Sequence, residues 1–379
     1  MAITVRLLSQ CNCGTNVSMP LGMSSPQRTV YPVTEGINSP QTKKKYDYYL
    51  KCFLKHFAIE SQEALLDLKD PRLIEGMVIR YIKYLAEERH LVYSSIYNRI
   101  AAVLHFFEMN DVLLNKRKIH KFIPPNESSH EDRPYTIEEI QRILDHSNER
   151  NRVIFLLMTS TGMRIGAIDG IRFGDLIEIP EYKLYKITVH ASSKRDRYYT
   201  FCTPECAIAI NEYRKYRERY GEVINKDAPL IRDNFDTTLH YHCEHPQKMT
   251  GKGLVSIVDR IVSRAGVAND EVMRSHGFRK RYVTIMKNCK VDYSDREYLV
   301  GHKRSRGLDI NYDRSTIEDR LSEYCKAIDS LTINQEHKLK SRISELENHH
   351  AAEWNVLKSE MEQMKQILDS LTLNMPMKK

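Results

Sequence analysis

Six side chains that can act on a phosphate group occur one after another along the chain. A tyrosine oxygen can attack a phosphodiester without a metal when neighbouring cations stabilise the charge of the transition state. Arginines suit that task, because each guanidinium donates two parallel hydrogen bonds to non-bridging oxygens. The candidate catalytic residues are Arg164 in TSTGMRIGAIDG, Lys194 in SSKRDR, His276 and Arg279 in SHGFRKRY, His302 in LVGHK and Tyr312 in NYDR.

This chemistry also needs groups that move protons. One proton must leave the tyrosine and another must reach the departing oxygen. We expect Lys194 rather than Arg195 to donate, because an arginine does not release its proton at neutral pH. Each motif alone has an ordinary reading: an arginine after Thr-Gly usually lies on the surface, a histidine before Gly-Phe is usually structural, and the chain has 22 tyrosines. The order and spacing of the whole set favour catalysis.

The apolar spacing before residue 120 predicts a small helical domain at residues 38–120. A first helix is expected from Thr42, a second through residues 77–85 and a third through residues 96–107, each with apolar side chains three or four residues apart. Ser94 or Ser95 is expected to cap the third helix. The lysines on these helices either face solvent or contribute to a basic surface.

A linker and a second domain follow. Residues 121–134 combine Pro-Pro with a polar, charged run that is typical of a linker. The domain at residues 135–331 is expected to open at Thr136, whose spacing to Glu139 predicts a capping box. Helices are expected at about 151–163, 204–219, 252–265 and 274–288, and a hairpin at 182–201. The predicted fold class is therefore mainly α with a small β-hairpin or sheet (α+β).

The two ends of the chain differ in composition. Residues 1–37 contain only three charged side chains and little periodicity, so we expect a flexible arm. Residues 332–379 place apolar side chains three and four residues apart over about four heptads. This pattern predicts a C-terminal helix that either forms a coiled coil or docks on its own chain.

The charge of the chain suits a polyanionic partner. The formal net charge is +8, and residues 332–379 hold seven Lys/Arg and seven Asp/Glu, so the whole basic excess precedes them. No apolar run is long enough to cross a bilayer and the first residues make a poor secretory signal, which predicts a soluble cytoplasmic protein. The eight scattered cysteines fit reduced thiols.

At these motifs the chain resembles the tyrosine recombinase family, also called the phage integrase family, over about residues 38–330. The matches are T-G-x-R at 161–164, H-x-x-R at 276–279, L-x-G-H at 299–302 and a tyrosine ten residues after the Gly-His pair. The continuation GLDINYDR is most similar to archaeal members. The resemblance implies a core DNA-binding domain at 38–120 and a catalytic domain at 135–331.

The resemblance also implies a role for each candidate residue. Tyr312 would attack a DNA phosphate, which forms a 3′-phosphotyrosine and frees a 5′-hydroxyl. Arg164 and Arg279 would hold the phosphate, and His302 would donate a further hydrogen bond to it.

The remaining roles concern protons and partners. His276 would act as an acid or base near the tyrosine, and Lys194 would protonate the leaving oxygen. No cofactor is expected, because the phosphotyrosine retains the bond energy and rejoining needs neither ATP nor metal. The implied partners are double-stranded DNA and further copies of the chain, four protomers acting together near the nucleoid as the integrase of a mobile element.

One position departs from this pattern. The family usually has an acid three residues after the first arginine, where this chain has Ala167; Asp169 or Asp175 is an alternative support for Arg164.

Separately, thiols and imidazoles that can bind zinc occur at Cys202, Cys206, His240, His242, Cys243 and His245. Their spacing matches no common zinc finger, so a loop near DNA or solvent is the favoured interpretation.

Two other functions compete with the recombinase. A type IB topoisomerase uses the same chemistry to relax DNA as a monomer, whereas the tail with oligomer-like spacing favours a recombinase. A DNA-binding protein that has lost catalysis is the other alternative, and the presence of the complete set of catalytic side chains argues against it.

Overall fold

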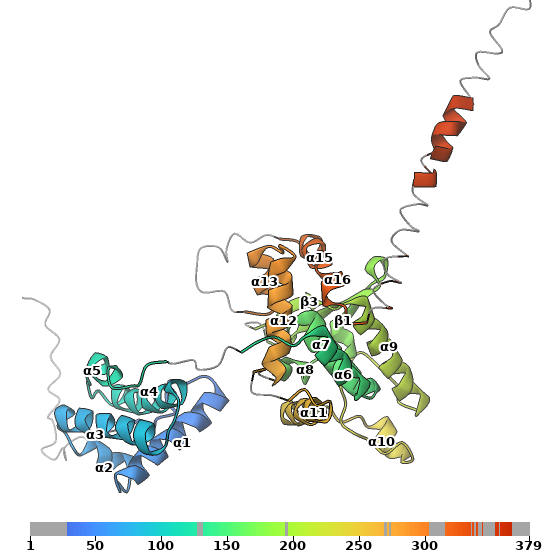
Figure 1. Ribbon diagram of the computed structural model, residues 1–379. Coiled ribbons are helices and arrows are strands. Elements are labelled where there is room, and N and C mark those ends of the chain that lie inside the picture. Colours follow the sequence, from blue (N-terminus) through green and yellow to red (C-terminus); the bar gives the residue numbers. More distant parts are fainter. Residues whose placement is uncertain are drawn as a thin grey trace, which may run out of the picture. The chain divides into compact units, whose positions relative to one another are not determined.

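The structure, a computed structural model, describes residues 29–126, 132–193, 196–268, 271–272, 274–302 and 315–334, and residues 336, 339, 343, 353–355 and 357–365 of the C-terminal stretch. The chain divides into two compact units, Met1–Ser129 and His130–Lys379 (Figure 1). The division falls within the stretch predicted as a linker, and the finer domain bounds stay predictions. Within the described residues, no helix is long and apolar enough to cross a membrane.

The described part of the first unit is helical around its own apolar core. Its elements are α1 (Pro40–His56), α2 (Gln62–Leu66), α3 (Pro71–Lys83), a π-helical turn (Tyr84–Glu88), α4 (Tyr93–Met109) and α5 (Lys116–His120). The core includes Leu50 and Phe53 of α1 and Ile100 and Phe107 of α4. The apolar spacing in the sequence therefore located these two helices correctly.

The start of α4 differs from the prediction. Val92 occupies the N-cap position and no side chain caps the helix. Ser94 and Ser95 already lie in its first turn, so the predicted serine cap is wrong. The carbonyl oxygen of Val92 accepts from the backbone nitrogens of Ser95 and Ile96, so the helical hydrogen bonds already begin before either serine.

The second unit contains helices and one small sheet. Its helices are α6 (Ile137–Asp145), α7 (Glu149–Thr161), α8 (Ile165–Ile168), α9 (Pro204–Arg219), α10 (His240–Glu244), α11 (Gly251–Arg264), α12 (Arg274–Asn288), α13 (Tyr293–Leu299), α15 (Ile317–Cys325) and α16 (Ile328–Leu331). The predicted capping box is confirmed, because Thr136 and Glu139 cap α6 reciprocally. The predicted helices at 151–163, 204–219, 252–265 and 274–288 correspond to α7, α9, α11 and α12.

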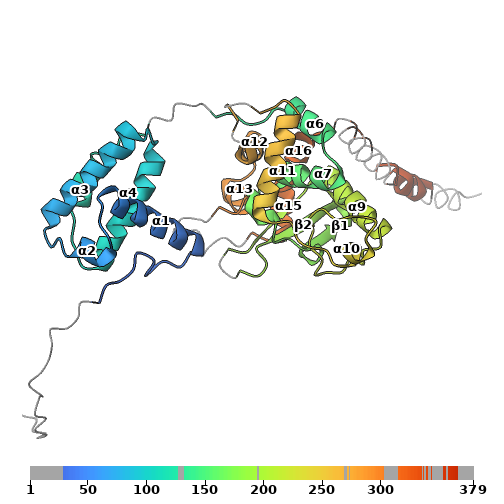
Figure 2. The same cartoon turned by 90° about the horizontal axis from the view of Figure 1, so that it is seen from below.

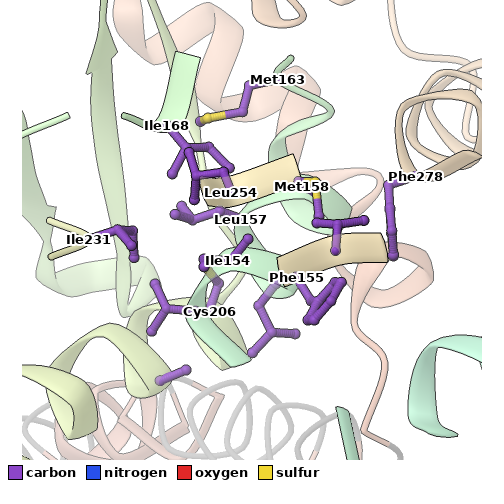
Figure 3. Close-up of a cluster of buried hydrophobic side chains, with 14 of the residues drawn as sticks. Ile154, Phe155, Leu157, Met158, Met163, Ile168, Cys206, Ile231, Leu254 and Phe278 are labelled. Atoms are coloured by element: carbon purple, nitrogen blue, oxygen red, sulfur yellow. The ribbon is translucent and has the colours of Figure 1, made fainter. Parts of the chain in front are cut away.

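Helix α7 is the centre of this unit and packs against α9 and α12 (Figures 1 and 2). Figure 3 shows Ile154 and Leu157 of α7 among apolar side chains from other elements, including Phe278 of α12. The polar end of the helix is buried as well, and the hydroxyl of Thr161 donates to the carbonyl oxygen of Leu157. Burial of this hydroxyl is therefore compatible with a stable helix end, because its hydrogen bond is satisfied within the helix.

The sheet has three antiparallel strands in the order β1 (Leu176–Ile179), β2 (Leu184–Val189) and β3 (Tyr198–Phe201). Strands β2 and β3 confirm the predicted hairpin, with Val189 paired to Tyr198. Strand β1 was not predicted, and its central residues are exposed, so the sequence carries little alternation there. The mainly α class with a small sheet is confirmed.

Candidate active site

Arg164 lies at a sharp turn that the fold fixes in place. Helix α7 ends at Gly162, which adopts the left-handed conformation (φ +62°). A Cβ at Gly162 would lie 2.5 Å from the ring of Tyr282, so only glycine fits here. The chain turns at once into α8, with the exposed Arg164 at its N-cap position. The prediction that Arg164 stands where a helix ends is confirmed.

Arg279 approaches the same turn from α12. Its side chain is buried, and Nη1 donates to the carbonyl oxygens of Gly162 at 2.6 Å and Val300 at 2.9 Å. Burial lowers the pKa of Arg279, and the nearby guanidinium of Arg164 lowers it further. Nη2 of Arg279 is buried and has no hydrogen-bond partner among the described residues.

The two arginines meet at the turn that precedes His302. Arg164 Nη1 donates to the carbonyl oxygen of Gly301 at 3.4 Å, next to the Val300 oxygen that accepts from Arg279. Two guanidiniums from motifs more than 100 residues apart are therefore held by consecutive carbonyl groups. Two like charges this close repel each other, so the pair is suited to an anion.

His302 has its ring held by an acid that the sequence analysis missed. Its Nδ1 lies 2.6 Å from Oε2 of Glu297, which belongs to α13, and both side chains are partly exposed. An ionised carboxylate only accepts, so this contact keeps a proton on Nδ1 and leaves Nε2 for another partner. The negative charge of Glu297 raises the pKa of Arg279 and so opposes the lowering caused by burial. The Glu297 carboxylate therefore lies near the arginines.

His276 and His302 line one pocket together with Arg279. The pocket has a volume of about 350 Å³, and its other lining residues are Asp132, Pro134, Lys280, Val283 and Thr284. His276 and Arg279 share one face of α12 because they are three residues apart. His276 is exposed, whereas Arg279 is buried. The pocket therefore presents basic side chains, which Asp132 partly offsets through its ion pair with Lys280.

Tyr198 of β3 is a second residue that the motifs did not reveal. A Cβ on Gly301, which has φ +67°, would lie 2.4 Å from the Tyr198 ring, so the ring packs directly against this turn. Burial raises the pKa of Tyr198 to about 12, and the nearby guanidiniums of Arg279 and Arg164 oppose the rise. Tyr198 therefore supports the turn that holds both arginines, and no spacing in the sequence connects it to them.

Two candidate residues and the two alternative supports for Arg164 remain to be placed. Lys194 and Tyr312 lie outside the described residues, so their roles stay predictions. Asp175 accepts from the backbone nitrogen of Arg172, and Asp169 lies at the C-cap position of α8. Among the described contacts, neither carboxylate forms a hydrogen bond or ion pair with Arg164. Among the described residues, Glu297 is the acid that supports the catalytic side chains. It contacts His302, and its charge lies near Arg279.

The candidate zinc ligands separate into different environments. Cys202 and Cys206 are buried in the apolar core at the start of α9, where burial raises the pKa of Cys206. His240, His242 and His245 are exposed at or next to α10, and Cys243 is buried. Within the described ranges, no three His, Cys, Asp or Glu side chains come together as metal ligands would.

Comparison with known proteins places this site in a family. Residues 135–318 match the phage integrase family. The XerH site-specific recombinase bound to its difH substrate, in a post-cleavage complex, is 16% identical with a TM-score of 0.50, covering 74% of this chain and 79% of that one. A lambda integrase dimer bound to a COC′ core site is 13% identical with a TM-score of 0.50, covering 74% and 92%.

These likenesses differ in what they establish. A search of curated protein sequences finds no match. The two solved structures support the fold alone at such low identity, and the narrower likeness to archaeal members stays a prediction. Residues 135–318 form a domain of the tyrosine recombinase family, also called the phage integrase family, whose members cleave and rejoin DNA strands.

Proposed function

We propose that this chain is a site-specific DNA recombinase that cuts and rejoins DNA through Tyr312. The supporting observation is the convergence of Arg164 and Arg279 on consecutive carbonyl groups beside His302. A phosphate between the guanidiniums would relieve their repulsion and supply an acceptor for Nη2 of Arg279, which has no partner in the described part of the chain. The same cations would stabilise the charge that develops in phosphoryl transfer.

The proposed steps assign one task to each remaining side chain. The Tyr312 oxygen attacks the scissile phosphorus and forms a 3′-phosphotyrosine. In its doubly protonated form, His302 donates through Nε2 to a non-bridging oxygen and through Nδ1 to the Glu297 carboxylate. His276, which lines the pocket, accepts the proton that leaves Tyr312, and Lys194 protonates the departing 5′-oxygen. Attack of a 5′-hydroxyl reverses these steps and rejoins the strand.

Double-stranded DNA is the proposed partner. The XerH and lambda integrase structures with this fold are recombinases bound to DNA sites. The basic excess of the chain suits the same polyanion. We further propose that four protomers act on two DNA segments and that the protein works at the nucleoid as the integrase of a mobile element.

A covalent adduct tests the proposal. Full-length protein is mixed with cognate DNA that carries a nick near the cleavage position, so that the short strand diffuses away and religation fails. Denaturing electrophoresis should show a slow protein–DNA band for the natural chain and none for Tyr312→Phe. Tyr293→Phe is the matched control, because Tyr293 is an exposed tyrosine of α13. A band that persists in Tyr312→Phe would refute the proposed nucleophile.

Strand exchange separates the recombinase from a topoisomerase. A recombinase joins strands from two DNA sites, whereas a topoisomerase rejoins the strand it cut. With two differently labelled sites, we expect exchanged products that require natural Tyr312. Relaxation of supercoiled DNA without exchanged products would favour the topoisomerase alternative.

A further inference from the structure

Helical residues near the C-terminus carry an exposed apolar row. Residues 353–355 and 357–365 are helical and are drawn in red in Figure 1. The exposed fractions are 67% for Trp354, 54% for Leu357, 69% for Met361 and 60% for Met364. Steps of three, four and three residues separate them, as between positions a and d of a coiled-coil heptad. Such a row on an exposed helix is typical of an interaction surface.

The chain is fastened to the catalytic unit before this row begins. The carboxylate of Glu205 accepts from the backbone nitrogens of Ile333 at 2.8 Å and Asn334 at 3.2 Å. Gln141 donates to the carbonyl oxygen of Ile333 at 3.3 Å. Residues up to Asn334 therefore belong to the folded unit, and the apolar row lies on the chain that follows this anchor.

The apolar row is too narrow for a helix that packs on a globular core. With Leu357 at d and Met361 at a, Lys358 occupies position e and Glu360 occupies position g, so charged residues border the row on both sides. A helix that docks on a core typically buries a wider face that includes e or g. A seam of only a and d positions between charged flanks is typical of a helix that pairs with another helix.

The charges at these flanks select the partner and its direction. Lys358 and Lys365 fall at successive e positions, and Glu353 and Glu360 at successive g positions. In a parallel pair, position g of one helix faces position e of the other helix five residues later. Glu353 then faces Lys358 and Glu360 faces Lys365 across the pair. An antiparallel pair would instead place g against g and e against e, which sets Glu against Glu and Lys against Lys.

We propose that this helix joins two copies of the chain in a parallel coiled coil. Because the pair is parallel, the two Asn334 anchors lie at the same end of the coil. Two catalytic units are therefore joined at matching points before DNA is bound.

One consequence rests on the proposed function. A joined pair raises the effective concentration of the second catalytic unit once the first has bound its half-site. Binding to two adjacent half-sites should then be cooperative. The pairing itself involves no DNA, so it is tested separately from recombination.

Charge reversal tests both the pairing and its direction. Full-length protein without DNA is measured by light scattering after gel filtration, at moderate salt and tens of micromolar. Lys358→Glu with Lys365→Glu makes all four flanking positions acidic, and Glu353→Lys with Glu360→Lys makes them all basic. The control is Asn355→Glu with Gln363→Glu, which adds charge at outward positions b and c. Circular dichroism verifies that each variant keeps its helical content.

The natural chain and the control should have the mass of two chains. Each reversed variant alone should dissociate, with a dissociation constant raised by about tenfold or more, and an equal mixture of the two should recover the mass of two chains. A natural chain with the mass of one chain would overturn the proposal. A Lys-to-Glu variant that pairs as well as the natural chain would also overturn it, because antiparallel helices would bring like charges together before and after the change.

Discussion

At the scale of single residues, the site depends on main-chain acceptors that hold cations together. Nη1 of Arg279 donates to the carbonyl groups of Gly162 and Val300, and Nη2 has no partner among the described residues. Arg164 binds the next carbonyl group, that of Gly301. This arrangement orients both guanidiniums before substrate arrives, so little reorganisation is needed during the reaction.

Replacing Arg279 with lysine should nearly abolish cleavage. A lysine keeps one charge but lacks the planar fork that serves two carbonyl groups and a phosphate together. We expect single-turnover cleavage to slow by about a hundredfold or more, the scale for loss of one preorganised transition-state donor. Arg274→Lys is the control on the same helix, because Arg274 forms an exposed ion pair with Asp259. Equal rates for Arg279→Lys and the natural chain would contradict the assigned role.

Glu297 should act as a positioning residue for His302. Glu297→Ala removes the acceptor for Nδ1, so the imidazole can rotate away from the phosphate. We expect cleavage to slow by about tenfold or more, because small misplacements of a donor are costly. Glu297→Gln retains an acceptor oxygen and should recover most of the rate. Equal losses in both variants, with unchanged thermal stability, would show that orientation is not the reason.

At the scale of elements, one turn connects the core to the site. The end of α7 is buried, and Gly162 reverses the chain against Tyr282 so that Arg164 emerges at the start of α8. The same Gly162 carbonyl group accepts from Arg279 of α12. A change in this turn should therefore affect stability and both arginines together.

Gly162→Ala tests that connection. The positive φ and the contact with Tyr282 should together lower the free energy of unfolding by about 2 kcal/mol or more. Thermal unfolding should show the loss, and cleavage at a temperature where the variant is folded should also fall. Gly166→Ala is the matched control, because nothing lies within 4 Å of its added Cβ. Similar melting temperatures for Gly162→Ala and the natural chain would disprove the steric argument.

The sequence predicted elements best where one periodicity dominates. Helices α9 and α12 agree with their predicted residues. The exposed strand β1 lacked such a signal. Glu297 and Tyr198 were missed for another reason: their contacts with the site arise only when α13 and β3 pack beside the turn at Gly301. Tertiary contacts of this kind leave no local pattern.

At the scale of the whole molecule, charge should govern the encounter with DNA. The excess of Lys and Arg lies before the C-terminal tail, in the part that contains both folded units. Each phosphate that the protein neutralises releases bound counterions from the duplex. Affinity for DNA should therefore depend steeply on salt.

A titration at several salt concentrations measures this dependence. If the protein makes six to ten phosphate contacts, affinity should fall by roughly a thousandfold or more between about 50 and 200 mM salt. Fluorescence anisotropy with a labelled duplex gives the slope, and a catalytically inactive Tyr312→Phe chain prevents cleavage during the titration. An affinity that is flat over this range would contradict a binding surface made of phosphate contacts.

Identification of the residue that carries the DNA tests the central claim most directly. The adduct formed on nicked cognate DNA is digested with nuclease and protease, and its peptides are sequenced by mass spectrometry. We predict a nucleotide joined through its 3′-phosphate to the oxygen of Tyr312 and to no other residue. A nucleotide on a different side chain, or one joined through its 5′-phosphate, would contradict the mechanism.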